Sequence, residues 1–100
     1  TLTTLQELYL TRNLIGVIDA KAFAANKSLK VVHLNENRIR SVPSTTFKYQ
    51  AQLQQLYLQY NPLQNLESVE WSTLLGFLPT EAEVIIEPRS NFVEMSPWYK

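Results

Sequence analysis

Hydrophobic positions recur along this chain every 24 residues over three consecutive segments. In each segment two aliphatic residues stand two positions apart, which predicts a short β-strand with one buried face. In the first segment these are Leu8 and Leu10, and Tyr9 between them points to the opposite face. Seven positions keep their chemical character in all three segments: Leu5/Leu29/Leu53, Leu8/Val32/Leu56, Leu10/Leu34/Leu58, Asn13/Asn37/Asn61, Ile15/Ile39/Leu63, Ile18/Val42/Leu66 and Phe23/Phe47/Trp71.

An asparagine follows each predicted strand, at Asn13, Asn37 and Asn61. Its amide has two N–H donors and an acceptor oxygen, enough to bond the backbone where the chain turns away from the strand. Each buried backbone group left unpaired there would cost about 1–3 kcal/mol. The later apolar and aromatic positions turn back inward, so each segment is predicted to form one coil of a right-handed solenoid.

The pattern LxxLxLxxNxL, followed by another apolar residue and then an aromatic one, resembles the leucine-rich repeat family. It runs from Leu5 to Ile15, from Leu29 to Ile39 and from Leu53 to Leu63. The resemblance implies an α/β solenoid with a short parallel β-sheet on its concave face and irregular or short helical segments on its convex side. The repeat length and the phenylalanine ladder are similar to those of animal extracellular and receptor proteins.

The resemblance divides the chain into a repeat region and a C-terminal region. Residues 1–71 hold three repeats (5–28, 29–52 and 53–71) after the end of an earlier one, to which Leu2 would belong. No N-terminal cap is visible, and an uncapped solenoid exposes its core. We therefore expect a fragment of a longer protein, or a second molecule that covers the Thr1 edge.

Residues 72–100 form the predicted C-terminal cap and tail. The apolar positions between Leu66 and Leu78 fit one amphipathic helix or two short turns. Glu83–Glu87 is expected to be a β-strand ended by Pro88. This order is similar to the C-terminal capping module of extracellular leucine-rich-repeat proteins, although the disulfide cysteines of that module are missing. The expected lid residues of the tail are Phe92, Met95, Trp98 and Tyr99.

Composition narrows the function classes. Nine basic residues balance nine acidic ones, so the basic excess typical of nucleic-acid and membrane-surface binders is missing. No apolar stretch is long enough to span a bilayer. With no cysteine, two glycines and one histidine, His33, we expect no metal, no cofactor and no glycine-rich phosphate loop. Catalysis is not expected either, because His33 and Glu36 fall on opposite strand faces and no glycine-flanked serine is present.

The resemblance implies partner binding on the concave face, where outward side chains of neighbouring strands form rows. The rows are Tyr9/His33/Tyr57, Thr11/Asn35/Gln59, Arg12/Glu36/Tyr60 and Glu7/Val31/Gln55. Exposed tyrosine and arginine suit the recognition of a protein ligand, whereas the alternative is aromatic pairing that only stabilises the sheet. The candidate partner-binding residues are Tyr9, Arg12, His33, Asn35, Glu36, Tyr57, Gln59 and Tyr60.

Two further positions have a functional and a plain interpretation. His33 could make a pH-sensitive contact, but a solvated histidine in a mixed row is the favoured interpretation, because no carboxylate cluster or second histidine accompanies it. Asn26-Lys27-Ser28 is an acceptor sequence for N-glycosylation, and such triplets also arise by chance.

Together these features predict a protein-binding module, the C-terminal part of a secreted or cell-surface protein. The alternative is a structural module that self-associates or stacks through its solenoid ends, using the unpaired N-terminal edge strand. An intracellular scaffold stays open because cysteines are absent.

Overall fold

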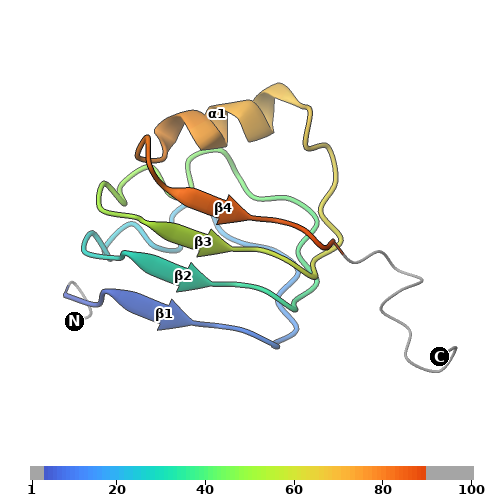
Figure 1. The fold of residues 1–100 in the computed structure, drawn as a ribbon, viewed down its shortest axis with the longest axis horizontal. Helices are drawn as coiled ribbons and strands as arrows, with labels where there is room; N and C mark the ends of the chain where they lie inside the picture. The colour runs from blue at the N-terminus through green and yellow to red at the C-terminus, as the bar shows by residue number, and fades with distance from the viewer. Residues whose placement is uncertain (1–3, 90–100) are drawn as a thin grey trace, which may run out of the picture.

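The computed structural model describes residues 4–89 of the chain. The predicted roles of Leu2, Phe92, Met95, Trp98 and Tyr99 lie outside these residues. Within them, four short strands form one parallel sheet in the order β1-β2-β3-β4, and the return limbs lie behind it (Figure 1). The strands are β1 (Glu7–Tyr9), β2 (Val31–His33), β3 (Gln55–Tyr57) and β4 (Glu83–Ile85). The predicted α/β solenoid with a short parallel sheet is confirmed.

The sheet register follows the sequence repeat through the first three strands and then changes. Leu8 pairs with Val32 and Val32 with Leu56, each 24 residues on. Leu56 then pairs with Val84, 28 residues on. The 24-residue spacing would have placed Thr80 there, so the chain needs four more residues to bring a β-branched apolar side chain into the row. The strand expected over Glu83–Glu87 ends earlier, at Ile85.

The core is a stack of inward ladders. Val32 and Leu56 are completely buried, as are Leu29 and Leu58. On the return limb the rings of Phe23 and Phe47 stack with centroids 5.3 Å apart. At the first coil the equivalent leucines, such as Leu8, are only partly buried, because within the described residues no earlier coil packs on them.

The segment before Pro79 forms one helix, α1 (Val69–Phe77), and not the alternative of two short turns. Ser68 caps it, since its side chain accepts a hydrogen bond from the Trp71 N–H at 3.2 Å. Leu74 is its one buried residue, while Val69 and Phe77 face solvent, so its apolar residues are not confined to one face. The helix lies beside β4, at the end of the sheet away from β1 (Figure 1).

Candidate recognition surface

The three ladder asparagines hold the chain where each strand ends. Nδ2 of Asn37 donates to the carbonyl oxygens of Leu34 in its own coil at 3.0 Å and of Leu10 in the preceding coil at 2.9 Å. Its Oδ1 accepts from the backbone N–H groups of Asn13 and Ile15. The predicted bonding of the turn backbone is confirmed, and the same buried amide also satisfies backbone groups of the preceding coil.

Asn61 repeats this arrangement one coil later, and Asn13 shows half of it. Nδ2 of Asn61 bonds Leu34 and Leu58, while its Oδ1 accepts from the Ile39 N–H at 3.0 Å. Asn13 donates to the Leu10 carbonyl at 2.9 Å but is exposed, because the bonds to a preceding coil have no counterpart among the described residues.

The aromatic row stands on the sheet face that points away from the return limbs. His33 lies between Tyr9 and Tyr57, with ring centroids 4.2 Å and 4.7 Å away and ring planes within 9° and 5° of parallel. These separations are close to the spacing of neighbouring strands, about 4.8 Å. Parallel pairing therefore stacks the three rings face to face.

A carboxylate from the neighbouring row, which was not among the candidate partner-binding residues, contacts this aromatic row. Glu7 Oε2 lies 3.1 Å from His33 Nε2, and the two residues are diagonal neighbours across β1 and β2. The favoured interpretation of His33 as a solvated histidine is therefore wrong, because only 20% of its side chain is exposed and Glu7 lies against its ring. Diagonal neighbours on parallel strands were the available signal.

Hydrogen bonds at this corner shift two pKa values. A hydrogen bond from Tyr9, and after it one from His33, lower the pKa of Glu7 below its ordinary 4.5, because both stabilise the charged carboxylate. The same Tyr9–Glu7 hydrogen bond raises the pKa of Tyr9 above 10.0. Glu7 and Tyr9 thus act as one polar unit at the exposed edge of the sheet.

The row Arg12/Glu36/Tyr60 lies just beyond the strand ends and adopts an unusual backbone. The φ angles of these residues are 62°, 60° and 62°, in the left-handed region that non-glycine residues rarely occupy. Each backbone N–H is held by the next coil, as in the 3.1 Å bond from Arg12 to the Asn35 carbonyl and the 2.7 Å bond from Tyr60 to that of Pro88. The sequence pattern did not reveal this conformation, because glycine does not occur at these positions.

Charges along this row are paired at one end. Arg12 Nε donates to Glu36 Oε1 at 2.9 Å, and this hydrogen bond raises the pKa of Arg12. Tyr60 continues the row with 48% of its surface exposed.

The remaining predicted rows are polar. Thr11 Oγ1 donates to Asn35 Oδ1 at 3.0 Å. Gln59 in the same row is half-buried, and its Oε1 is enclosed without a hydrogen-bond partner among the described residues. In the row that begins with Glu7, Gln55 Nε2 reaches Glu83 Oε1 at 3.2 Å, so β4 extends the polar row by one strand.

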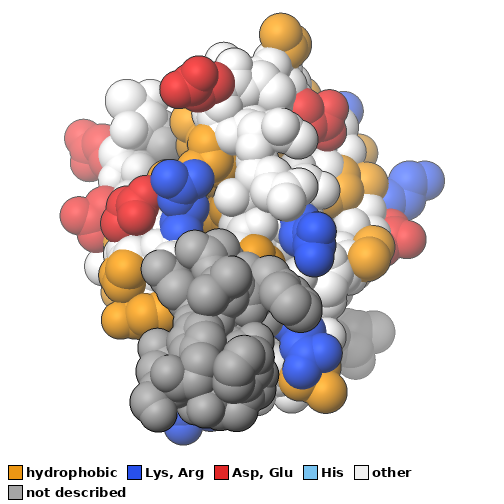
Figure 2. All heavy atoms as spheres, turned by 90° about the vertical axis from the view of Figure 1, so that its right-hand side faces the viewer, with side chains coloured by type: hydrophobic (Ala, Val, Ile, Leu, Met, Phe, Trp, Pro, Cys, Tyr) orange, Lys and Arg blue, Asp and Glu red, His pale blue; other side chains and the backbone are white. Residues whose placement is uncertain are grey.

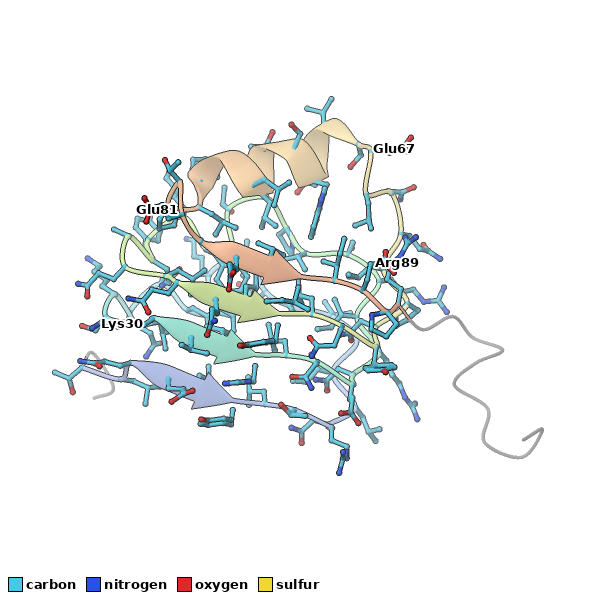
Figure 3. All side chains as sticks on the ribbon, in the orientation of Figure 1. Lys30, Glu67, Glu81 and Arg89 are labelled. Carbon is cyan, nitrogen blue, oxygen red and sulfur yellow. The ribbon has the colours of Figure 1, made fainter. Side chains whose placement is uncertain are left out.

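Charged side chains lie both where the strands of the sheet begin and where they end (Figure 3). Lys30 and Glu81 lie near the starts of β2 and β4, and Arg89 lies at the opposite end, beyond β4. Figure 2 views the molecule from the side at which the strands end, where basic, acidic and hydrophobic side chains are interspersed on the described surface.

A buried amide on the return limb was also missed. Gln50 is 1% exposed, and its Nε2 donates to the carbonyl oxygens of Phe23 at 2.6 Å and Asn26 at 3.1 Å. The signal was the recurrence of an amide side chain at Asn26 and Gln50, 24 residues apart. Glycosylation of Asn26 stays a prediction, and the side chain at the equivalent position of the next coil points inward.

The described residues offer little for metal or membrane chemistry. Among residues 4–89 no group of three or more histidine, cysteine or acidic side chains could hold a metal ion. No helix in the same range is long and apolar enough to cross a membrane.

Stacked 24-residue coils, an asparagine ladder and an open row of outward side chains define a repeat-built recognition scaffold. Residues 3–63 match the family described as leucine rich repeat. The match covers more than half of the chain, and the chain belongs to that family. No curated protein sequence matches it. Leucine-rich repeats are in general protein-interaction modules and are typically not enzymes.

Proposed function

We propose that this chain recognises a protein partner through the outward face of its parallel sheet and performs no catalysis. The observation that carries the proposal is the stacked row Tyr9–His33–Tyr57, flanked at the strand ends by Arg12 and Tyr60. Three parallel rings held by backbone pairing lose little conformational entropy when a partner packs on their edges. Their hydroxyl and imidazole groups supply directional hydrogen bonds at the same place.

The polar surroundings support the same use. The Glu7–His33 and Arg12–Glu36 pairs fix long side chains in defined positions before any partner arrives, which lowers the ordering cost of binding. The candidates Asn35 and Gln59 lie two residues beyond the ends of β2 and β3, between the aromatic row and the row of Arg12, Glu36 and Tyr60. Specific interfaces bury about 800 Å² per partner, which is more than three repeats expose on one face. We therefore expect the sheet face to supply only one part of the interface.

The proposal is tested by affinity capture with two matched tyrosine variants. Tyr60 and Tyr49 are 48% and 47% exposed, but Tyr60 follows β3 whereas Tyr49 lies on the return limb beside Lys48. We expect Tyr60→Ala, and more strongly the triple variant with Tyr9→Ala and Tyr57→Ala, to lose a partner that the parent chain and Tyr49→Ala retain. Equal retention by all four baits would mean that the sheet face is not the binding surface. Circular dichroism of each bait excludes unfolding as the cause of a loss.

A second candidate function is assembly through the N-terminal edge of the solenoid. It is supported by the edge strand β1 and by the high exposure of Leu14 (74%) and Val17 (89%) in the first coil. Light scattering over a concentration series tests it, and a strictly monomeric chain would remove this candidate.

We further propose that the chain belongs to a larger secreted or cell-surface protein. The repeat length and the Phe23–Phe47 ladder support this location, and the alternative that the absence of cysteine leaves open is an intracellular scaffold. Antibody detection of the native protein in the medium, on the surface of intact cells and in the cytosol distinguishes the extracellular from the intracellular location. Recovery from the cytosol alone would contradict the proposal.

A further inference from the structure

A hollow of about 580 Å³ lies beside the strand ends, lined by Arg12, Asn13, Leu14, Glu36, Asn37, Arg38 and Tyr60. Asn13 and Asn37 are engaged with backbone groups, so they supply its structural wall. The other five side chains decide what could bind there. The volume falls within the range of sites that hold small ligands or a few side chains of a partner, about 300–1,000 Å³.

Three lining residues hold the left-handed conformation described above. A non-glycine residue pays about 1–2 kcal/mol for it, and glycine would adopt it freely. Here an arginine, a glutamate and a tyrosine occupy the positions. Since strained positions of this kind concentrate at binding sites, the side chains themselves point to a role for the hollow.

The charges of the hollow leave one cation free. Glu36 is engaged by Arg12 at 2.9 Å, so this pair is close to neutral. Arg38 is exposed and takes part in no ion pair among residues 4–89. A guanidinium matches a carboxylate with two parallel hydrogen bonds. With Glu36 engaged by Arg12, Arg38 supplies one positive charge, which one carboxylate neutralises, whereas a doubly charged phosphate needs a second cation.

Apolar surface stands next to this cation. Leu14 is 74% exposed and Tyr60 48% exposed, and both line the hollow with Arg38. Apolar side chains this exposed gain by being covered, at about 25 cal/mol per Å² of apolar area removed from water. The hollow therefore combines one cation that can bind a carboxylate with an adjacent apolar contact surface.

We propose that this hollow anchors a peptide segment of a protein partner that carries an aspartate or glutamate beside an aliphatic side chain. Arg38 binds the carboxylate, Leu14 and Tyr60 cover the aliphatic group, and the Arg12–Glu36 pair holds the intervening backbone in register. The inference rests on the proposed recognition of a protein partner and adds the chemistry of the recognised segment.

The test uses the full chain labelled with nitrogen-15 and the peptide acetyl-Leu-Glu-Leu-amide at millimolar concentration. Its neutral isostere acetyl-Leu-Gln-Leu-amide is the control ligand. We expect the side-chain Nε–H signal of Arg38 and the backbone signal of Tyr60 to shift with the acidic peptide, and its affinity to exceed that of the isostere about tenfold. Equal shifts with both peptides, or no shift with either, would overturn the proposal.

Matched variants locate the effect. Arg38→Gln should weaken binding of the acidic peptide about tenfold, whereas Arg40→Gln removes an exposed arginine outside the hollow and should leave binding unchanged. Equal losses would indicate unspecific charge attraction and would contradict the proposal. An unchanged amide spectrum of free Arg38→Gln shows that the variant is folded.

The same variants separate this inference from the proposed function. If Arg38→Gln bait retains a partner that the tyrosine triple variant loses, the hollow is not used although the sheet face is. If the parent, Tyr49→Ala, Tyr60→Ala and triple-variant baits all retain a partner equally, the proposed function itself fails.

Discussion

Oδ1 of Asn37 accepts a hydrogen bond from the backbone N–H of Asn13 at 3.1 Å, so the ladder residue of one coil holds the ladder residue of the coil before it. Because Asn37 also bonds carbonyl oxygens in both coils, its side chain works as a clamp between neighbours. A solenoid has few long-range contacts beyond those between adjacent coils, so such clamps contribute much of its cohesion.

Asn37→Ala is therefore expected to destabilise the fold by about 3 kcal/mol, since it leaves several buried backbone groups unpaired. The control is Asn35→Ala, which removes one half-buried bond to Thr11 and should cost about 1 kcal/mol or less. Urea unfolding followed by circular dichroism gives both values. Equal midpoints for the two variants would show that the ladder register is wrong.

A similar loss is expected for Gln50→Ala. Without its Nε2 the carbonyl oxygens of Phe23 and Asn26 lose a donor, and a cavity opens beside the phenylalanine ladder. We expect about 2–4 kcal/mol of destabilisation. Gln52→Ala, at an exposed position two residues on, should change the free energy of unfolding by less than about 0.5 kcal/mol. Similar costs for both glutamines would contradict a clamp role for Gln50.

The backbone at Tyr60 makes an unusual stability prediction. Because its φ is 62°, Tyr60→Gly should be more stable than Tyr60→Ala by about 1 kcal/mol, the reverse of the order at ordinary positions. At Tyr57, inside β3, the alanine variant should be the more stable one. Thermal unfolding of the four variants measures both orders. If alanine is preferred at both sites, Tyr60 does not hold a left-handed conformation in solution.

The corner formed by Glu7, Tyr9 and His33 predicts a pH dependence. The pKa of Glu7 is lowered in the folded chain, so the stabilisation that it contributes is present above the unfolded pKa, near 4.5, and is lost as pH falls through the lower folded pKa. The pKa of Tyr9 is raised above 10.0, and its contribution is lost only as pH rises through that higher value.

The pKa of Glu7 can be measured from the carbon-13 chemical shift of its carboxyl group over a pH series. Tyr9→Phe should raise the pKa of Glu7, because the hydrogen bond from Tyr9 is the largest single cause of its lowering. Tyr49→Phe, on the return limb, should leave it unchanged. A Glu7 pKa that stays the same in Tyr9→Phe would remove the tyrosine from this corner.

The sequence by itself determined the solenoid, because every coil repeats the same inward positions. Leu8, Val32 and Leu56 share one environment, and Asn37 and Asn61 meet the same turn, so local pattern and global stacking agree. The rows of outward residues also follow from the 24-residue spacing, since parallel pairing places equivalent residues side by side.

The tertiary structure decided what lies between these repeated positions. The Glu7–His33 contact joins diagonal neighbours, and the Gln50 clamp reaches back into the preceding coil. Both depend on side-chain directions that spacing does not specify. The left-handed turns at Arg12, Glu36 and Tyr60 arise because hydrogen bonds from the next coil hold a conformation that these residues avoid on their own. The hollow beside Arg38 exists only once three coils have stacked, because its walls come from residues that are remote along the chain and adjacent in space.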